Sequence, residues 1–135
     1  MSDPASRSEK VIAVVNSSDD TVEMLRACLE AHGFRKVVTA HGRDFREGSA
    51  DFFKFLEENQ PALFLYDISL PYERNWEFLQ GLLSTGAMQG RRLVLTTTNK
   101  RALDGLVGPT DAMEVLGKPY DLDQIIGAVV RALDV

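Results

Sequence analysis

The chain has 135 residues, which is the size of one domain. Its 15 lysines and arginines against 20 aspartates and glutamates give a net charge of −5, so direct nucleic-acid binding through a basic face is disfavoured. One cysteine excludes an internal disulfide and a cysteine-based zinc cluster. No apolar run is as long as a membrane span, and the polar first ten residues do not resemble a signal peptide. We therefore expect a cytoplasmic protein without membrane association.

Five short apolar runs predict β-strands, and the segments between them predict helices. The runs are almost continuously apolar, as is typical of strands covered by helices on both faces. The expected strands are residues 11–15, 36–40, 62–66, 92–96 and 112–116. The expected helices follow the NSSDD segment at 16–20 and lie at 51–59, 75–83, 100–107 and 122–133. Asp121 and Gln124 have the spacing of a capping box at the start of the last helix.

Alternating strands and helices predict an α/β protein with helices on both faces of a parallel sheet. Residues 1–10 are expected to form a flexible tail and residues 41–49 a polar connection, which leaves 11–135 as the domain. Two arrangements of five such strands are familiar, half of a Rossmann fold and the flavodoxin-like order 2-1-3-4-5. In both arrangements, ligands bind at the carboxyl ends of the strands.

Several polar residues follow the expected strands at that edge. Asn16 and Ser17 follow the first strand, Asp67 the third and Lys118 the fifth, while Thr96 ends the fourth. Each residue alone has an ordinary explanation as a turn, cap or strand residue. Together they place one carboxylate, one hydroxyl, one ammonium group and two small polar side chains around one shallow pocket.

Four segments give the chain a resemblance to the receiver domains of bacterial two-component response regulators. They are VIAVV at 11–15, FLYDISLP at 64–71, LVLTT at 93–97 and LGKPYD at 116–121. The resemblance implies the flavodoxin-like (βα)5 sandwich with sheet order 2-1-3-4-5. It also implies that Asp67 accepts a phosphoryl group from a phosphohistidine of a partner kinase. Lys118 and Thr96 would contact phosphoryl oxygens, and Pro119 would follow a cis peptide bond.

The sequence departs from the family where family members hold Mg²⁺ with an acidic pair after the first strand. That pair falls on Asn16 and Ser17. A metal site at Asn16, Ser17, Asp67 and Ser69 is therefore expected to be degenerate, since Mg²⁺ prefers carboxylate oxygens. We expect weak or absent Mg²⁺ binding and no other cofactor. Asp19 and Asp20, three residues further along, are an alternative source of carboxylates, disfavoured because a shift of three residues moves a side chain most of a helical turn.

Further departures concern the surroundings of the site. Thr97 replaces the usual alanine or glycine and would narrow access. Val115 replaces a common tyrosine or phenylalanine that reports phosphorylation. The segment between Ala40 and Pro61 is several residues longer than in typical family members.

Two functions follow from this resemblance. The first is an atypical receiver domain in phosphorelay signalling, with Asp67 as phosphoacceptor and weak or absent Mg²⁺-dependent phosphorylation. The second is a pseudo-receiver that binds other proteins without phosphorylation. A flavodoxin-like ligand binder or enzyme is disfavoured because no strand is followed by a glycine-rich phosphate loop. We expect no enzymatic activity beyond self-phosphorylation or dephosphorylation at Asp67.

The expected partners are a sensor histidine kinase or phosphotransfer protein, or a downstream protein. A downstream protein would bind the face formed by residues 100–107, 112–116 and the last helix. That face includes Ala102, Leu106 and Met113. A homodimer through it is left open.

Overall fold

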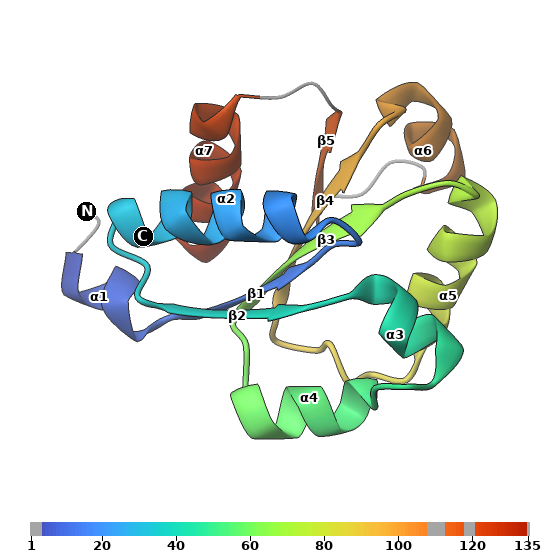
Figure 1. The fold of residues 1–135 in the computed structure, drawn as a ribbon, viewed down its shortest axis with the longest axis horizontal. Coiled ribbons are helices and arrows are strands. Elements are labelled where there is room, and N and C mark those ends of the chain that lie inside the picture. The colour runs from blue at the N-terminus through green and yellow to red at the C-terminus, as the bar shows by residue number, and fades with distance from the viewer. Residues whose placement is uncertain (1–3, 108–112, 118–120, 135) are drawn as a thin grey trace.

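The computed structural model describes residues 4–107, 113–117 and 121–134. Its strands are β1 (Val11–Val15), β2 (Lys36–Ala40), β3 (Leu63–Ile68), β4 (Arg92–Thr97) and β5 (Met113–Gly117). All neighbouring strands are parallel, and their order across the sheet is β2-β1-β3-β4-β5 (Figure 1). This order confirms the flavodoxin-like prediction and excludes the half-Rossmann alternative, in which the second strand lies between the third and the first.

The five predicted helices are present. They are α2 (Asp19–Ala31), α4 (Phe52–Asn59), α5 (Tyr72–Ser84), α6 (Lys100–Val107) and α7 (Leu122–Leu133). The capping box predicted for α7 is confirmed, since Asp121 accepts the Gln124 N–H while the Gln124 side chain accepts the Asp121 N–H. Helix α5 begins earlier than predicted because the Pro71 carbonyl already accepts the Asn75 N–H.

Two short helices were not predicted from the sequence. Helix α1 (Pro4–Glu9) lies where a flexible tail was expected. Proline suits the first turn of a helix, and Arg7 donates to the His32 carbonyl and lies over the Phe34 ring, 5.6 Å from its centroid. These contacts attach α1 to the end of α2.

The second unpredicted helix, α3 (Gly42–Glu47), lies in the segment expected to be a polar connection. Its only large buried side chain is Phe45, whose ring packs edge-on against Phe52 and Phe55 of α4. One apolar residue in six gives no helical periodicity. Helices α3 and α4 together account for the extra length before β3.

Helices cover both faces of the sheet (Figure 1). One core lies between the sheet and helices α3, α4, α5 and α6, and it contains most of the aromatic side chains. The other core lies between the sheet and helices α2 and α7, and it is mainly aliphatic. The protein is thus a three-layer α/β sandwich, as predicted.

This arrangement brings three polar residues to one place. Successive side chains of a strand alternate between the two faces of a sheet. The residues two positions before Asn16, Asp67 and Thr96 all belong to the core under α2 and α7. The three polar side chains therefore lie on that same face, at the carboxyl edge of adjacent strands β1, β3 and β4.

Candidate functional site

Asp67 and Thr96 form the centre of the site. They are opposite each other in the register of β3 and β4. The Thr96 hydroxyl donates a hydrogen bond of 2.7 Å to Oδ1 of Asp67, and both residues are buried, with 1% and 8% of their surfaces exposed. A hydrogen bond to a charged acceptor is shorter and stronger than a neutral one. The structure thus joins two of the residues that the sequence placed at this edge.

The end of β1 contributes Asn16 and Ser17, and their side chains differ in environment. Asn16 is 4% exposed, its backbone N–H donates to the Ala40 carbonyl, and its Oδ1 accepts the Ser18 N–H at 3.0 Å. Ser17 is exposed. Ser18 in turn caps helix α2 by accepting the Thr21 N–H. The Asn16 amide oxygen is therefore already used to shape the turn into α2.

The loop after β3 is held from two directions. The buried Asn75 side chain donates to the Ser69 carbonyl at 2.8 Å. The hydroxyl groups of Tyr72 and Thr98 are hydrogen-bonded, which connects the start of α5 to the β4–α6 loop. Sequence reasoning missed both contacts. A buried asparagine in a first helical turn is a weak signal, and the Tyr72–Thr98 pair is too far apart in the chain to leave one.

The other residues that the sequence analysis discussed around the site are Lys118, Pro119, Val115 and Asp19. Lys118 and Pro119 lie outside the described residues, as does the side chain of Val115. Asp19 pairs with His41 at the end of β2, with 2.7 Å between its Oδ1 and Nε2 of His41. Since β1 separates β2 from β3, Asp19 is engaged on the side of β1 away from Asp67.

Thr97 does not project into an open pocket. Its side chain is fully buried, and its hydroxyl accepts the Asn99 N–H at 3.3 Å. That bond helps shape the loop into α6. Narrowing of the site by Thr97 stays a prediction.

The described residues suit Mg²⁺ poorly. Among them, no group of three or more histidine, cysteine or acidic side chains could hold a metal ion. Asp67 offers one carboxylate, whose Oδ1 already accepts the Thr96 hydroxyl. The Asn16 oxygen is bonded to Ser18, and Ser17 offers a neutral hydroxyl. Hard divalent cations usually need more carboxylate oxygen than this.

Tyr66, directly before Asp67, is a polar residue that sequence reasoning assigned to a strand without further comment. Its side chain is 1% exposed on the opposite face of the sheet. Burial raises the pKa of its hydroxyl to about 12, although the nearby Arg46 guanidinium acts in the lowering direction. That guanidinium does not reach hydrogen-bonding geometry with the hydroxyl. A tyrosine within an apolar run gives no sign of such an environment.

No family model matches the sequence. The chain is 28% identical over 123 residues to response regulator Rre1 of Synechocystis sp.. The match covers 90% of this chain but 50% of the relative. The chain thus spans about half the length of the curated relative that it matches.

Solved structures of receiver domains share the fold. A signal receiver domain of a two-component histidine kinase from Clostridium thermocellum matches with a TM-score of 0.75 and 12% identity, over 94% of this chain and 99% of that one. The receiver domain of a putative LuxO repressor protein from Vibrio parahaemolyticus gives 0.71 and 17%, over 93% and 90%. Chemotaxis protein CheY4 of Vibrio cholerae gives 0.67 and 19%, over 91% and 98%.

The chain has the fold and the sheet order of receiver domains, and its sequence is similar to that of a response regulator. These findings agree with the resemblance that its sequence motifs indicated. In the part of the chain that the structure describes, no helix is long and apolar enough to cross a membrane.

Proposed function

We propose that this receiver domain, residues 11–135, takes part in phosphorelay signalling with Asp67 as its phosphoacceptor, and that Mg²⁺-dependent phosphorylation is weak or absent. The observation that carries the proposal is the buried Asp67 carboxylate with the Thr96 hydroxyl bonded to it. In a receiver, these residue types at these strand ends are the acceptor and the hydroxyl that contacts the phosphoryl group. The phosphoryl donor would be a histidine kinase or phosphotransfer protein in the cytoplasm.

The chemistry assigns a task to each residue. An Asp67 carboxylate oxygen attacks phosphorus, and the bond from phosphorus to the donor breaks. The Thr96 hydroxyl, already directed at Asp67, would then donate to an oxygen of the transferred group. Lys118 is the proposed source of positive charge. Catalysis of phosphoryl transfer consists mainly of positioning and charge neutralisation, and Asn16 and Ser17 neutralise no charge.

The Asn16 amide oxygen accepts the Ser18 N–H and is thus already used in the turn into α2 instead of holding a metal ion. This supports the second candidate, a pseudo-receiver that works without phosphorylation. Such a protein would bind partners through a surface that does not change. The proposed surface is the face of α6, β5 and α7. On it Leu106 is 37% exposed and Ala102 is half-buried, while the Met113 side chain lies outside the described residues.

Incubation with acetyl phosphate, followed by intact-mass measurement, distinguishes the two functions. The first predicts slow addition of one phosphoryl group, little affected by Mg²⁺ and abolished by Asp67→Asn. The second predicts no addition under any condition. Rapid addition that requires Mg²⁺ would contradict the proposed weakness of the metal site, and addition to the Asp67→Asn variant would contradict the acceptor.

A further inference from the structure

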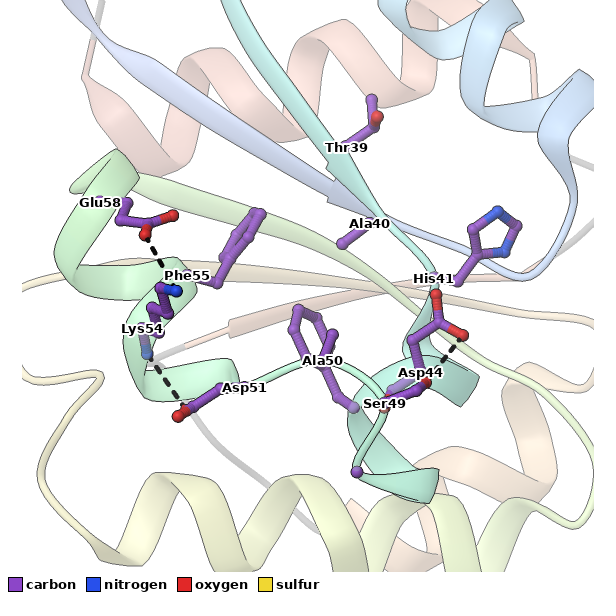
Figure 2. A pocket seen from close by; sticks show the side chains of 12 residues that line it. Thr39, Ala40, His41, Asp44, Ser49, Ala50, Asp51, Lys54, Phe55 and Glu58 are labelled. Atoms are coloured by element: carbon purple, nitrogen blue, oxygen red, sulfur yellow. Dashed lines mark hydrogen bonds and ion pairs between the residues drawn. The ribbon is translucent and has the colours of Figure 1, made fainter.

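Outside the strand-end site, a cavity of about 690 Å³ lies beside the edge strand β2 (Figure 2). Residues of helices α3 and α4, of the end of β2 and of the connections between them line this open cavity. Its apolar lining is made of Ala40, Phe45, Ala50 and Phe55. The unpredicted helix α3 and the long connection before β3 create this cavity, so it belongs to the part of the chain that departs most from the sequence-based expectation.

The strand that borders the cavity has an open hydrogen-bonding edge. Strand β2 is at the end of the sheet and pairs only with β1. The Ala40 carbonyl accepts the Asn16 N–H, so Ala40 directs its backbone groups toward β1. Backbone groups alternate in direction along a strand, and those of Val37 and Thr39 therefore point away from the sheet. Within the described residues, no backbone group pairs with them on that side.

The rim of the cavity is acidic. The carboxylates of Asp44, Asp51 and Glu58 line it, against the single ammonium group of Lys54. Nζ of Lys54 lies 3.8 Å from Oε1 of Glu58, so the charges of these two side chains already balance each other. Asp51 caps α4, whereas Asp44 has only a 3.3 Å bond from the Ser49 hydroxyl. The remaining negative charge favours a cationic occupant.

We propose that this edge binds an extended basic peptide segment of a partner protein, which adds to the sheet as a sixth strand beside β2. Its backbone pairs with the open groups of Val37 and Thr39. Every second side chain then points toward the cavity, where a lysine or arginine stem packs on Phe45 and Phe55 while its charged end reaches the rim. Added strands gain affinity from main-chain bonds and specificity from pockets for alternate side chains. The proposal is independent of phosphorylation at Asp67.

Selection from a display library of random nine-residue peptides on the whole protein tests this proposal. We expect enriched peptides with lysine or arginine at alternate positions and no proline between them. The variant Asp44→Asn/Glu58→Gln should weaken the binding of a selected peptide at least tenfold. Glu47→Gln/Glu57→Gln is the matched control, because it removes the same charge from exposed positions of α3 and α4 that do not line the cavity. It should change binding less than twofold.

The position and the mode of binding are tested with the same selected peptide. Amide exchange measured by NMR should show protection of Val37 and Thr39 on binding. N-methylation of alternate peptide residues should abolish binding in one of the two alternating registers and leave it in the other. The proposal is wrong if no peptide is enriched, if enriched peptides are acidic or purely apolar, or if both double variants bind alike. It is also wrong if Val37 and Thr39 are protected by self-association without peptide, since a second copy would then occupy the edge.

Discussion

Asp67 and Tyr66 are successive residues of β3 that lie on opposite faces of one sheet, and their polar atoms differ in environment. The Asp67 carboxylate receives a hydrogen bond from the neighbouring strand. The Tyr66 hydroxyl is buried near Arg46 without a hydrogen bond of normal geometry. A buried polar group lowers the stability of the folded state when it has no hydrogen-bond partner, so most buried polar groups are paired. The comparison shows that β3 holds its charged atom through a specific bond and its neutral hydroxyl mainly through packing.

The largest expected effect is a loss of folding stability at high pH, which is linked to Tyr66. Its folded-state pKa of about 12 exceeds the ordinary value of 10.0, so the unfolded chain loses the proton first. The stability linked to Tyr66 is therefore intact below pH 10 and is lost as the pH rises toward 12. A shift of this size corresponds to roughly 2–3 kcal/mol.

The measurement is urea unfolding from pH 8 to 12 on the wild type and Tyr66→Phe. The variant should be nearly as stable as the wild type at pH 8 and should lose less stability above pH 10. Tyr72→Phe is the control for alkaline titration of a less buried tyrosine. If the free energy of unfolding falls with pH equally in the wild type and Tyr66→Phe, the Tyr66 hydroxyl is accessible to solvent in the folded protein.

The other side of the comparison is tested by Thr96→Val, which keeps the shape of the side chain and removes the hydroxyl. The buried Asp67 carboxylate then loses a bond to a charged acceptor, and we expect a loss of about 2 kcal/mol in the free energy of unfolding. Urea unfolding at neutral pH measures it. The double variant Asp67→Asn/Thr96→Val should be more stable than Thr96→Val alone, because it no longer has a buried carboxylate that lacks the hydrogen bond from Thr96. An additive double variant would contradict the coupling.

The two residues also show what a sequence reveals about a site. Asp67, Thr96 and Asn16 could be placed together because parallel strands bring their carboxyl ends to one edge. The five strands were predictable for the same reason, since each is a continuous apolar run. Helix α3 was not, because Phe45 alone anchors it. Neither was the Tyr66 environment, which depends on Gly42 and Arg46 and therefore on that unpredicted helix. The role of Lys118 stays a prediction.

The third prediction concerns the acidic pair that family members have after the first strand, where this chain has Asn16 and Ser17. Asn16→Asp/Ser17→Asp should raise Mg²⁺ affinity at least tenfold, which is about 1.4 kcal/mol. An aspartate at position 16 can still accept the Ser18 N–H with one oxygen and leave the other for the metal. Calorimetric titration with MgCl₂ measures the affinity, and MgCl₂ should raise the melting temperature of the double variant because the ion binds only the folded state.

The control for this change is Asp19→Asn/Asp20→Asn in the double variant, which leaves the created site intact and should not reduce its Mg²⁺ affinity more than twofold. If the double variant is folded but does not bind Mg²⁺, the missing carboxylates do not explain the proposed weakness of the site. The shape of the turn after β1 would then be the better explanation.

The smallest expected effect concerns that turn and separates two neighbouring serines. Ser18 caps α2 by accepting the Thr21 N–H at 3.3 Å, whereas Ser17 is exposed and makes no such bond. Loss of an N-cap side chain costs about 1 kcal/mol, so Ser18→Ala should lower the free energy of unfolding by that amount. Ser17→Ala, one residue away and chemically identical, should change it by less than about 0.5 kcal/mol. Urea unfolding measures both. Both serines lie within the turn closed by the hydrogen bond from the Ser18 N–H to the Asn16 side chain. Equal losses of stability in the two variants would therefore mean that this bond, and not the Ser18 cap, determines where α2 begins.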